Sequence, residues 1–279
     1  MAVKIIIDST TDLIPEIKEK TTVVPLTVHF GEKEYIDGVA ITHKQFYEKL
    51  VETDVLPHTS QATPADFSTV FQQVSDSGDS AVVITLSSKL SGTYQSAMIA
   101  AADYDNIFVI DSDSVTIGAG ILAELALQLV DSGMDAPSVA ERLENEKKNV
   151  RIIAMVDTLE YLKKGGRVSK TVAFAGGLLN IKPVLSVVQG EIIMLGKARG
   201  SKQGNNLLVT EIENCGGVDF SRPVLLGYTG LSDILLQKYI EDSADLWKNG
   251  VGKLNTTAIG SVIGTHAGPG AIAAAFFKK

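Results

Sequence analysis

The chain has 279 residues, 45% of them hydrophobic, which is enough for one large or two ordinary domains with a real core. Its formal net charge of −8 argues against a nucleic-acid surface and leaves at most transient contact with anionic membranes, because both need clustered Lys and Arg. The single cysteine, Cys215, excludes an internal disulfide and a Cys-rich metal site, and fits a reducing compartment.

The first half of the chain predicts an α/β lobe. Residues 1–12 pass from two small residues into a strand-like run without a signal-peptide pattern, so we expect a cytoplasmic protein. Short β-branched runs at 3–8, 80–86 and 106–111 have the composition of buried parallel strands, and a polar turn and a helical pattern follow each. This repetition predicts a doubly wound, mostly parallel sheet over about residues 1–150.

Two helices of this half are indicated by their first residues. Thr42 and Gln45 form a capping-box pattern, and Thr63-Pro64 with Asp66 places a proline at the first helical position. The stretch between these helices, residues 53–62, is predicted to be a loop.

The second half, about residues 151–279, predicts an α+β lobe. Strand-like runs at 151–157 and 182–200 alternate with short helical patterns at 158–166 and 172–180. The apolar run 258–277 is broken by His266, Pro269 and glycines, and is predicted to form a strand, a turn and a buried helix. A cleft between two unlike lobes is a common position for a small-molecule site.

Three hydroxyl-rich loops of the first half follow predicted parallel strands. They are 9–11, 91–93 and 112–114, and we expect them to meet at the carboxyl edge of the sheet, with Thr59 and Ser60 joining them. The helix that begins near Gly92 would direct free backbone amides and its positive dipole end toward an anionic group. The alternative is that these Ser and Thr residues only cap helices.

The stretch "LSSKLSGTYQSA" (86–97) fits neither of two enzymatic motifs. It lacks the spacing of a phosphate-binding loop and that of a nucleophile elbow. Of the four histidines, His266 alone lies at the end of an apolar run and before glycines. It is either structural, or an anchor for a carboxylate or an activator of a hydroxyl. A hydrolase or phosphotransferase that uses Ser91 and His266, and a regulatory sensor of a small acid, therefore remain open.

Several motifs coincide with one family: "DSTTDL", "HTSQATPADF", "LSSKLSGTYQSA", "LEYLKKGGRVS", "LLNIKPVL" with "GKAR", and "IGTHAGPGAIAAAFF". Over essentially its whole length the chain resembles the DegV family, the fatty-acid-binding subunits of bacterial fatty acid kinases. The resemblance implies a two-lobed α/β protein that encloses a long-chain fatty acid in a tunnel between the lobes. It also implies no cofactor and no enzymatic activity of the chain alone. A separate kinase subunit would phosphorylate the bound carboxylate with ATP, and the chain would carry the acyl phosphate for lipid metabolism.

The resemblance also implies roles for particular residues. The carboxylate site falls on Thr59, Ser91 and His266. From the loops themselves we add Ser60 and the backbone amides of Gly92 and Thr93 to the expected ligand-binding set. Ala62 and Lys89 depart from the usual proline and glycine of the family, which puts the shape of these loops in doubt.

Two arginines also match family motifs. Arg167 matches a contact to the kinase subunit, although a cation after "KKGG" is also typical of a helix C-terminus. Arg199 matches a motif without an assigned role. The segment 172–181 is predicted to line the tunnel.

Overall fold

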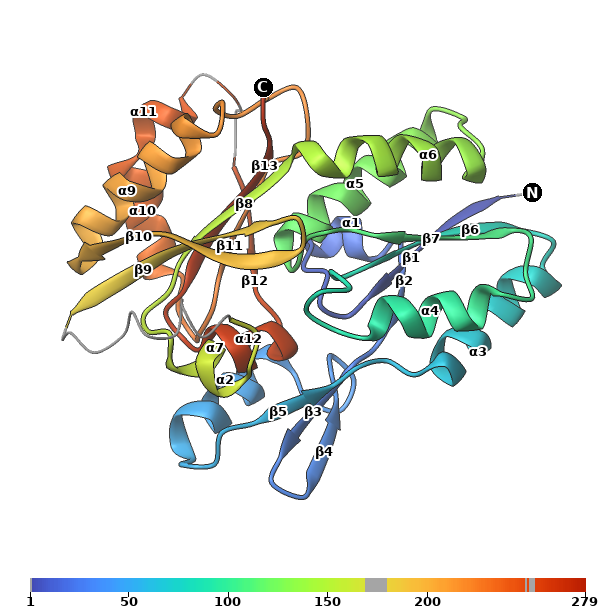
Figure 1. Cartoon of the computed structure of the whole chain (residues 1–279), viewed down its shortest axis with the longest axis horizontal. Helices are drawn as coiled ribbons and strands as arrows, with labels where there is room; N and C mark the ends of the chain where they lie inside the picture. The colour runs from blue at the N-terminus through green and yellow to red at the C-terminus, as the bar shows by residue number, and fades with distance from the viewer. Residues whose placement is uncertain (1, 169–179, 249, 251–253) are drawn as a thin grey trace.

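Four parallel strands form the first sheet, in the order β2-β1-β6-β7 (Figure 1). The structure is a computed structural model, and it describes residues 2–168, 180–248, 250 and 254–279. The strands are β1 (Val3–Asp8), β2 (Thr22–Val24), β6 (Ser80–Thr85) and β7 (Ile107–Asp111). The three strands predicted in this half are therefore confirmed.

Helices cover both faces of the parallel sheet (Figure 1). One face carries α3 (Pro64–Asp76) and α4 (Thr93–Ala101), and the other carries α5 (Ile117–Asp131) and α6 (Ala136–Glu146). A short helix, α1 (Pro15–Lys18), follows β1. The α/β prediction for this half is confirmed, and so is the capping box that starts α3 at Thr63.

The second sheet is mixed, with six strands in the order β10-β9-β8-β13-β11-β12. Its strands are β8 (Val150–Met155), β9 (Ile181–Val188), β10 (Glu191–Arg199), β11 (Leu225–Tyr228), β12 (Asn255–Ala258) and β13 (Ile272–Phe277). Its outer face is covered by α9 (Gly200–Asn214), α10 (Ile234–Asp242) and α11 (Ala244–Trp247) (Figure 1). The strand-like run 182–200 forms the antiparallel pair β9 and β10.

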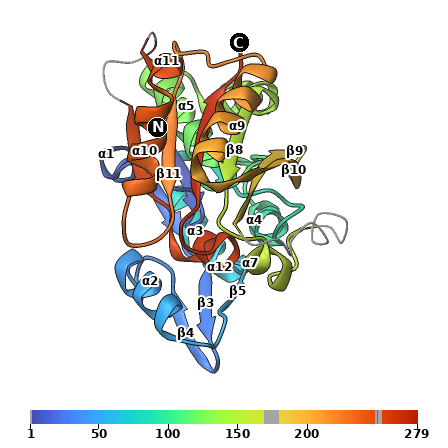
Figure 2. The same ribbon diagram turned by 90° about the vertical axis from the view of Figure 1, so that its left-hand side faces the viewer.

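A third, small sheet lies below the other two, in the order β4-β3-β5 (Figure 2). It consists of β3 (Thr27–Phe30), β4 (Lys33–Ile36) and β5 (His58–Ser60), and α2 (His43–Glu52) packs beside it with the predicted Thr42 capping box. The prediction that 53–62 is a loop is wrong at β5. The three polar residues of β5 are too few to show a period, and their strand state comes from pairing with β3, where Thr59 faces Val28.

The prediction for residues 258–277 has its elements in the wrong order. The chain forms the helix α12 (Ser261–Ala267) first and the strand β13 second. The run Ala273–Ala275 has high helix propensity, but β13 pairs with β8 on one side and β11 on the other, and all six of its residues are buried. Tertiary pairing therefore overrides local propensity here.

The two halves share one core. The architecture changes near residue 150, where the 3-10 turn Lys147–Asn149 leads into β8. Helix α5 packs against β1 of the first sheet and against β8, β11 and β13 of the second. Two more elements, α12 and the short helix α7 (Glu160–Lys164), lie between the mixed sheet and the small sheet (Figure 2). Within the described part of the chain, no helix combines the length and the apolar composition needed to cross a bilayer.

Candidate functional site

A pocket of about 370 Å³ lies where the three sheets meet. This volume is within the usual range for small-molecule sites. Most of its lining is apolar: Leu26, Leu86, Leu90, Val115, Ile152, Ala154, Val156, Leu162, Leu185, Val187, Ile192, Ile259, Val262, Ile263, Ala267, Ala271 and Ala273. Polar lining residues are fewer: Thr59, Ser60, Gln61, Ser91, Thr116, Arg167, Ser186, Thr229 and His266.

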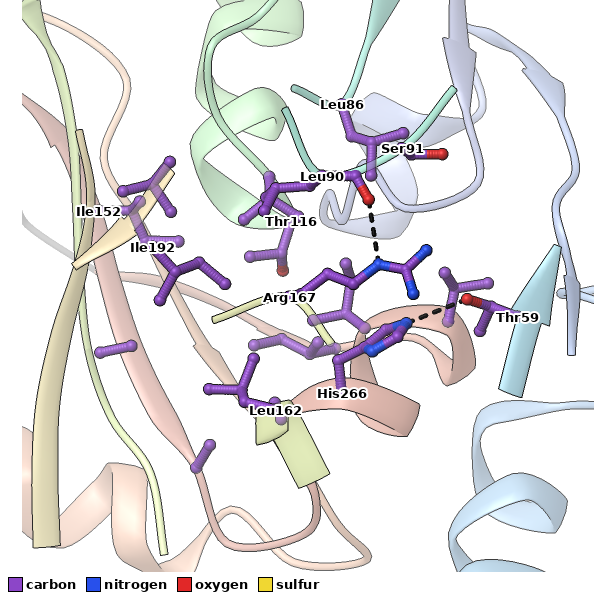
Figure 3. Close-up of a pocket in the computed structure, with 18 of the residues that line it drawn as sticks. Thr59, Leu86, Leu90, Ser91, Thr116, Ile152, Leu162, Arg167, Ile192 and His266 are labelled. Atoms are coloured by element: carbon purple, nitrogen blue, oxygen red, sulfur yellow. Dashed lines mark hydrogen bonds between the residues drawn. The ribbon is translucent and has the colours of Figure 1, made fainter. Parts of the chain in front are cut away.

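The polar residues Thr59, Ser91, Arg167 and His266 gather at one end of the pocket (Figure 3). They come from four elements: β5, the loop before α4, the segment after α7, and α12. Thr59 Oγ1 lies 3.0 Å from His266 Nε2, which joins the small sheet to α12. Ile152 and Ile192 line the opposite end (Figure 3).

The imidazole of His266 is neutral near pH 7. Burial lowers its pKa to about 4, and the nearby positive charge of Arg167 acts in the same direction. The other ring nitrogen, Nδ1, is buried without a hydrogen-bond partner and faces Gly165, where an added Cβ would lie 2.2 Å from it. Since an unpaired buried N–H is avoided, we assign the proton to Nε2, which donates to Thr59. The Thr59 hydroxyl proton is then free to point into the pocket.

The Ser91 hydroxyl is fixed by its neighbour Thr93. The two hydroxyl oxygens are 2.9 Å apart, and the Thr93 amide donates to Ser91 Oγ at 3.3 Å. Thr93 is fully buried and does not line the pocket. Its hydroxyl and amide therefore orient Ser91, so that Ser91 rather than Thr93 faces a ligand.

Gly92 leaves room for the side chain of Gln61, a residue that the sequence analysis did not assign to the site. A Cβ at Gly92 would lie 2.1 Å from Gln61 Oε1. Gln61 Nε2 donates to Ser96 Oγ at 2.9 Å, so the carboxamide is held between β5 and α4. Gly92 thus permits the close approach of these two elements beside the polar end of the pocket.

Arg167 lies at the polar end of the pocket and is exposed (Figure 3). Its Nε donates to the Leu90 carbonyl at 3.2 Å, and one terminal nitrogen donates to the Gly165 carbonyl at 2.7 Å. Helix α7 does end in the predicted manner, with Lys164 in its last turn and Gly166 at φ +69°. Arg167 also supplies a positive charge beside Thr59 and His266.

The apolar wall is the inner face of the second sheet. Ala154 of β8 and Ala273 of β13 are direct cross-strand partners, and both line the pocket. Leu185 of β9 pairs with Ala154 and lines the pocket as well. The pair of small alanines leaves space that larger side chains would fill.

The structure brings together most of the predicted site residues. Those that line the pocket are Thr59, Ser60, Ser91, Gly92, Arg167 and His266. Arg199 does not line it, and its backbone amide donates to Gln203 Oε1 at 3.1 Å. The hydroxyl groups of the loops 9–11 and 112–114 are buried and lie outside the lining. Ser9 Oγ, for example, accepts from the Leu26 amide, and the Ser112 hydroxyl donates to the Ser114 carbonyl of its own loop.

Several lining residues were missed by sequence reasoning. Gln61 stood within the quoted motif "HTSQATPADF". Thr116 follows a polar turn and Thr229 an apolar run, and neither belongs to a motif that the sequence analysis used. The predicted tunnel segment falls largely outside the described residues, at 172–179. Among the residues that are described, no group of three or more His, Cys, Asp or Glu side chains has the arrangement of a metal site.

Comparison with known proteins identifies the family. A model of the DegV family, described as "Uncharacterised protein, DegV family", matches residues 2–279. The chain is 37% identical over 283 residues to a DegV domain-containing protein of Caldanaerobacter subterraneus subsp. tengcongensis, with 99% of each chain covered. The chain belongs to the DegV family.

Solved structures of relatives have the same fold. One is a protein of Eubacterium ventriosum described as binding stearic acid, with a TM-score of 0.88, 30% identity and coverage of 100% of this chain and 99% of that one. Another is DegV of Bacillus subtilis, described as a fatty acid binding protein, with a TM-score of 0.84, 31% identity and both chains fully covered.

Proposed function

We propose that this protein binds one long-chain fatty acid in the pocket between its sheets. The carboxylate would lie at Thr59, Ser91 and His266, and the tail against the inner face of the second sheet. The observation that carries this proposal is a largely apolar pocket of about 370 Å³ with a small polar group at one end. The shared fold of relatives described as fatty acid binding proteins supports it.

The energetics of such a ligand agree with this lining. Removing a C16 tail from water contributes up to about 11 kcal/mol at ~0.8 kcal/mol per methylene, before the losses of association. The tail therefore supplies most of the affinity. The head group needs only hydrogen bonds and a nearby charge, since an unpaired buried carboxylate would keep its proton. The hydroxyls of Thr59 and Ser91 and the guanidinium of Arg167 are suited to these tasks.

We propose further that the bound carboxylate is presented to a separate, ATP-dependent kinase subunit. A carboxylate oxygen would attack the γ-phosphorus of ATP while the bond to the ADP oxygen breaks, which leaves an acyl phosphate on this chain. The chain itself would be a cytoplasmic carrier for lipid metabolism, with no cofactor and no catalytic activity of its own. The exposed position of Arg167 at the polar end supports a head group within reach of a partner.

The geometry favours binding over hydrolysis by Ser91 and His266. A serine nucleophile needs a base within hydrogen-bond reach. His266 Nε2 pairs with Thr59 instead, and Ser91 Oγ pairs with Thr93. Within the described residues, no hydrogen bond joins Ser91 to His266.

The first experiment is mass spectrometry of organic extracts of the purified protein. We expect a long-chain fatty acid at about one per chain. Extracts free of such an acid, together with an unloaded protein that fails to bind added stearate, reject the binding function. A different co-purified small acid would instead support a sensor of that acid.

The kinase step has its own test. The acid-loaded protein is mixed with the kinase subunit and ATP, and acyl phosphate is trapped with hydroxylamine. We expect product only when all three are present. Turnover of ATP or of acyl esters by the chain alone would reject the carrier function.

A further inference from the structure

The motif "DSTTD", residues 8–12, has no role in the proposed function. Its two acidic side chains are buried, Asp8 at 0% and Asp12 at 5% exposure, and neither lines the pocket. Buried carboxylates are rare because their desolvation is costly unless they accept good hydrogen bonds. The groups that donate to them therefore indicate what the motif holds in place.

The two acids reach different parts of the polar site. Asp8 Oδ2 accepts from the Leu86 amide at 2.7 Å, and Leu86 opens the loop that carries Ser91. Asp12 accepts from two elements at once. Its Oδ2 receives the Thr116 hydroxyl at 2.6 Å, and its Oδ1 receives the Gly260 amide at 2.9 Å.

One partner of Asp12 lines the pocket, and the other begins a helix that lines it. Thr116 lines it and precedes α5, while Gly260 is the N-cap residue of α12, whose sixth residue is His266. Helix α12 has only seven residues, so its position depends on how its ends are fixed. At its start Asp12 holds Gly260, and Asp37 accepts from the hydroxyl of Ser261. Near its end His266 pairs with Thr59.

The backbone of Thr116 is a second, independent sign that this contact matters. Its φ of 50° and ψ of −129° lie outside the regions that a β-branched residue normally adopts. Such a conformation persists only where surrounding contacts impose it, and it is often found at functional sites. The short hydrogen bond to a buried carboxylate is a contact of this kind.

We propose that Asp12 is a positioning residue of the carboxylate site. Through one carboxylate it fixes the start of α12, and so keeps His266 against Thr59, and it holds Thr116 in the pocket wall. The inference rests on the proposed fatty acid binding. In this proposal, Asp12 of the acidic motif aligns two elements, at Thr116 and at Gly260, that lie 104 and 248 residues away in the chain.

The test compares Asp12→Ala with Val139→Ala. Val139 is fully buried on α6 and does not line the pocket, so its truncation weakens the core without touching the site. Binding of stearate and of 1-octadecanol is measured by displacement of a fluorescent fatty acid. The ratio of the two affinities isolates capture of the head group. We expect Asp12→Ala to lower this ratio about tenfold, which is the size expected when hydrogen bonds to the charged stearate carboxylate are lost. We expect Val139→Ala to leave the ratio unchanged.

A second readout follows His266 directly. The ring 15N shifts of His266, assigned with a His266→Gln variant, report which nitrogen carries the proton and whether Nε2 is hydrogen-bonded. We expect these shifts to change in Asp12→Ala and not in Val139→Ala. A folded Asp12→Ala protein with the wild-type affinity ratio and wild-type His266 shifts overturns the proposal.

If Asp12→Ala does not fold, the variants Thr116→Val and Thr116→Ser test the proposal in its place. The valine removes the hydroxyl that Asp12 holds, and the serine keeps it. We expect the affinity ratio to fall in Thr116→Val and to be retained in Thr116→Ser; an unchanged ratio in Thr116→Val overturns the proposal. A wild-type protein that binds no stearate at all would instead reject the proposed function.

Discussion

Thr59 and His266 are 207 residues apart in the chain, yet Thr59 Oγ1 lies 3.0 Å from His266 Nε2. The contact joins a three-residue strand of the small sheet to the short helix α12. Because the imidazole is neutral and donates, it orients the threonine hydroxyl toward a ligand without adding charge. The polar end of the pocket therefore depends on two elements that meet only in the folded protein.

Replacing Thr59 with valine keeps its shape and removes the hydroxyl. We expect stearate binding to weaken about tenfold, since the carboxylate loses a donor and His266 loses its acceptor. Thr59→Ser keeps the hydroxyl and should bind within about threefold of the wild type. Displacement of a fluorescent fatty acid measures both, and equal affinities for the valine and serine variants would show that Thr59 does not contact the head group.

Ser91→Ala should affect the head group more than the tail. We expect weaker stearate binding and a larger loss of acyl-phosphate formation, because the carboxylate loses a donor that also aligns it. Binding of 1-octadecanol, which reports burial of the tail, should change little. Full acyl-phosphate formation by the Ser91→Ala protein would contradict this role.

Arg167 lines the pocket and is also exposed to solvent. Its role in ligand binding can therefore be tested separately from a role in contacting the kinase subunit. Because exposed ion pairs contribute up to about 1 kcal/mol, we expect Arg167→Gln to weaken stearate binding by about fivefold at most. A partner contact predicts a further loss of phosphorylation even when the pocket is saturated with acid. If the fully loaded variant is phosphorylated at the wild-type rate, the partner contact is rejected and Arg167 acts only in ligand binding.

The alanine pair of the apolar wall should limit the length of the tail. Ala273→Leu adds three carbon atoms at the cross-strand partner of Ala154, inside the pocket. We expect shorter fatty acids to co-purify with this variant, as measured by mass spectrometry of extracts. Ala123→Leu overpacks a buried site on α5 that does not line the pocket, and should leave the chain-length distribution unchanged.

The buried acids should make stability depend on pH. Burial raises the pKa of Asp12 to about 7 and that of Asp8 to about 6, against hydrogen bonds that act in the opposite direction. Between pH 3.8 and 7 the folded state therefore holds protons on these groups that the unfolded state has lost. Their contribution to stability is largest below pH 3.8 and is lost as the pH rises through 7.

The measurement is the free energy of unfolding of the wild type relative to Asp12→Asn. We expect this difference to fall by up to about 4 kcal/mol from pH 4 to pH 8. The comparison is needed because His266, whose pKa is lowered, changes stability in the opposite direction below pH 6.5. The charged and titratable groups around Asp12 are Lys18, Asp37 and Tyr47, which both proteins share. A pH-independent difference would show that Asp12 is ionised throughout this range.

The parts of the fold that the sequence predicted are those with strong local signals. Buried β-branched strands and capped helices carry their pattern within a few residues, as in β1, β6 and the start of α3 at Thr63. The misplaced parts depend on distant partners. Strand β5 exists because it pairs with β3, and β13 is a strand because it fills the position between β8 and β11.

The site shows the same limit. Thr59, Ser91 and His266 were predicted from motifs that resemble a family, and the fold brings them to one pocket. Gln61 and Thr116 were not singled out, because a side chain reveals its place in a pocket only through packing that no short pattern records. Nor does sequence show that Thr93 faces away from the pocket while Ser91, two residues earlier, lines it.

Strand β13 has a consequence for synthesis of the protein. It follows every other strand in chain order but occupies an interior position in the six-stranded sheet, where it supplies Ala273 to the pocket. On the ribosome, the strands on its two sides remain unjoined until β13 has emerged. The apolar wall of the pocket is therefore joined only after β13 has been made, and a nascent chain that still lacks β13 does not have the complete pocket.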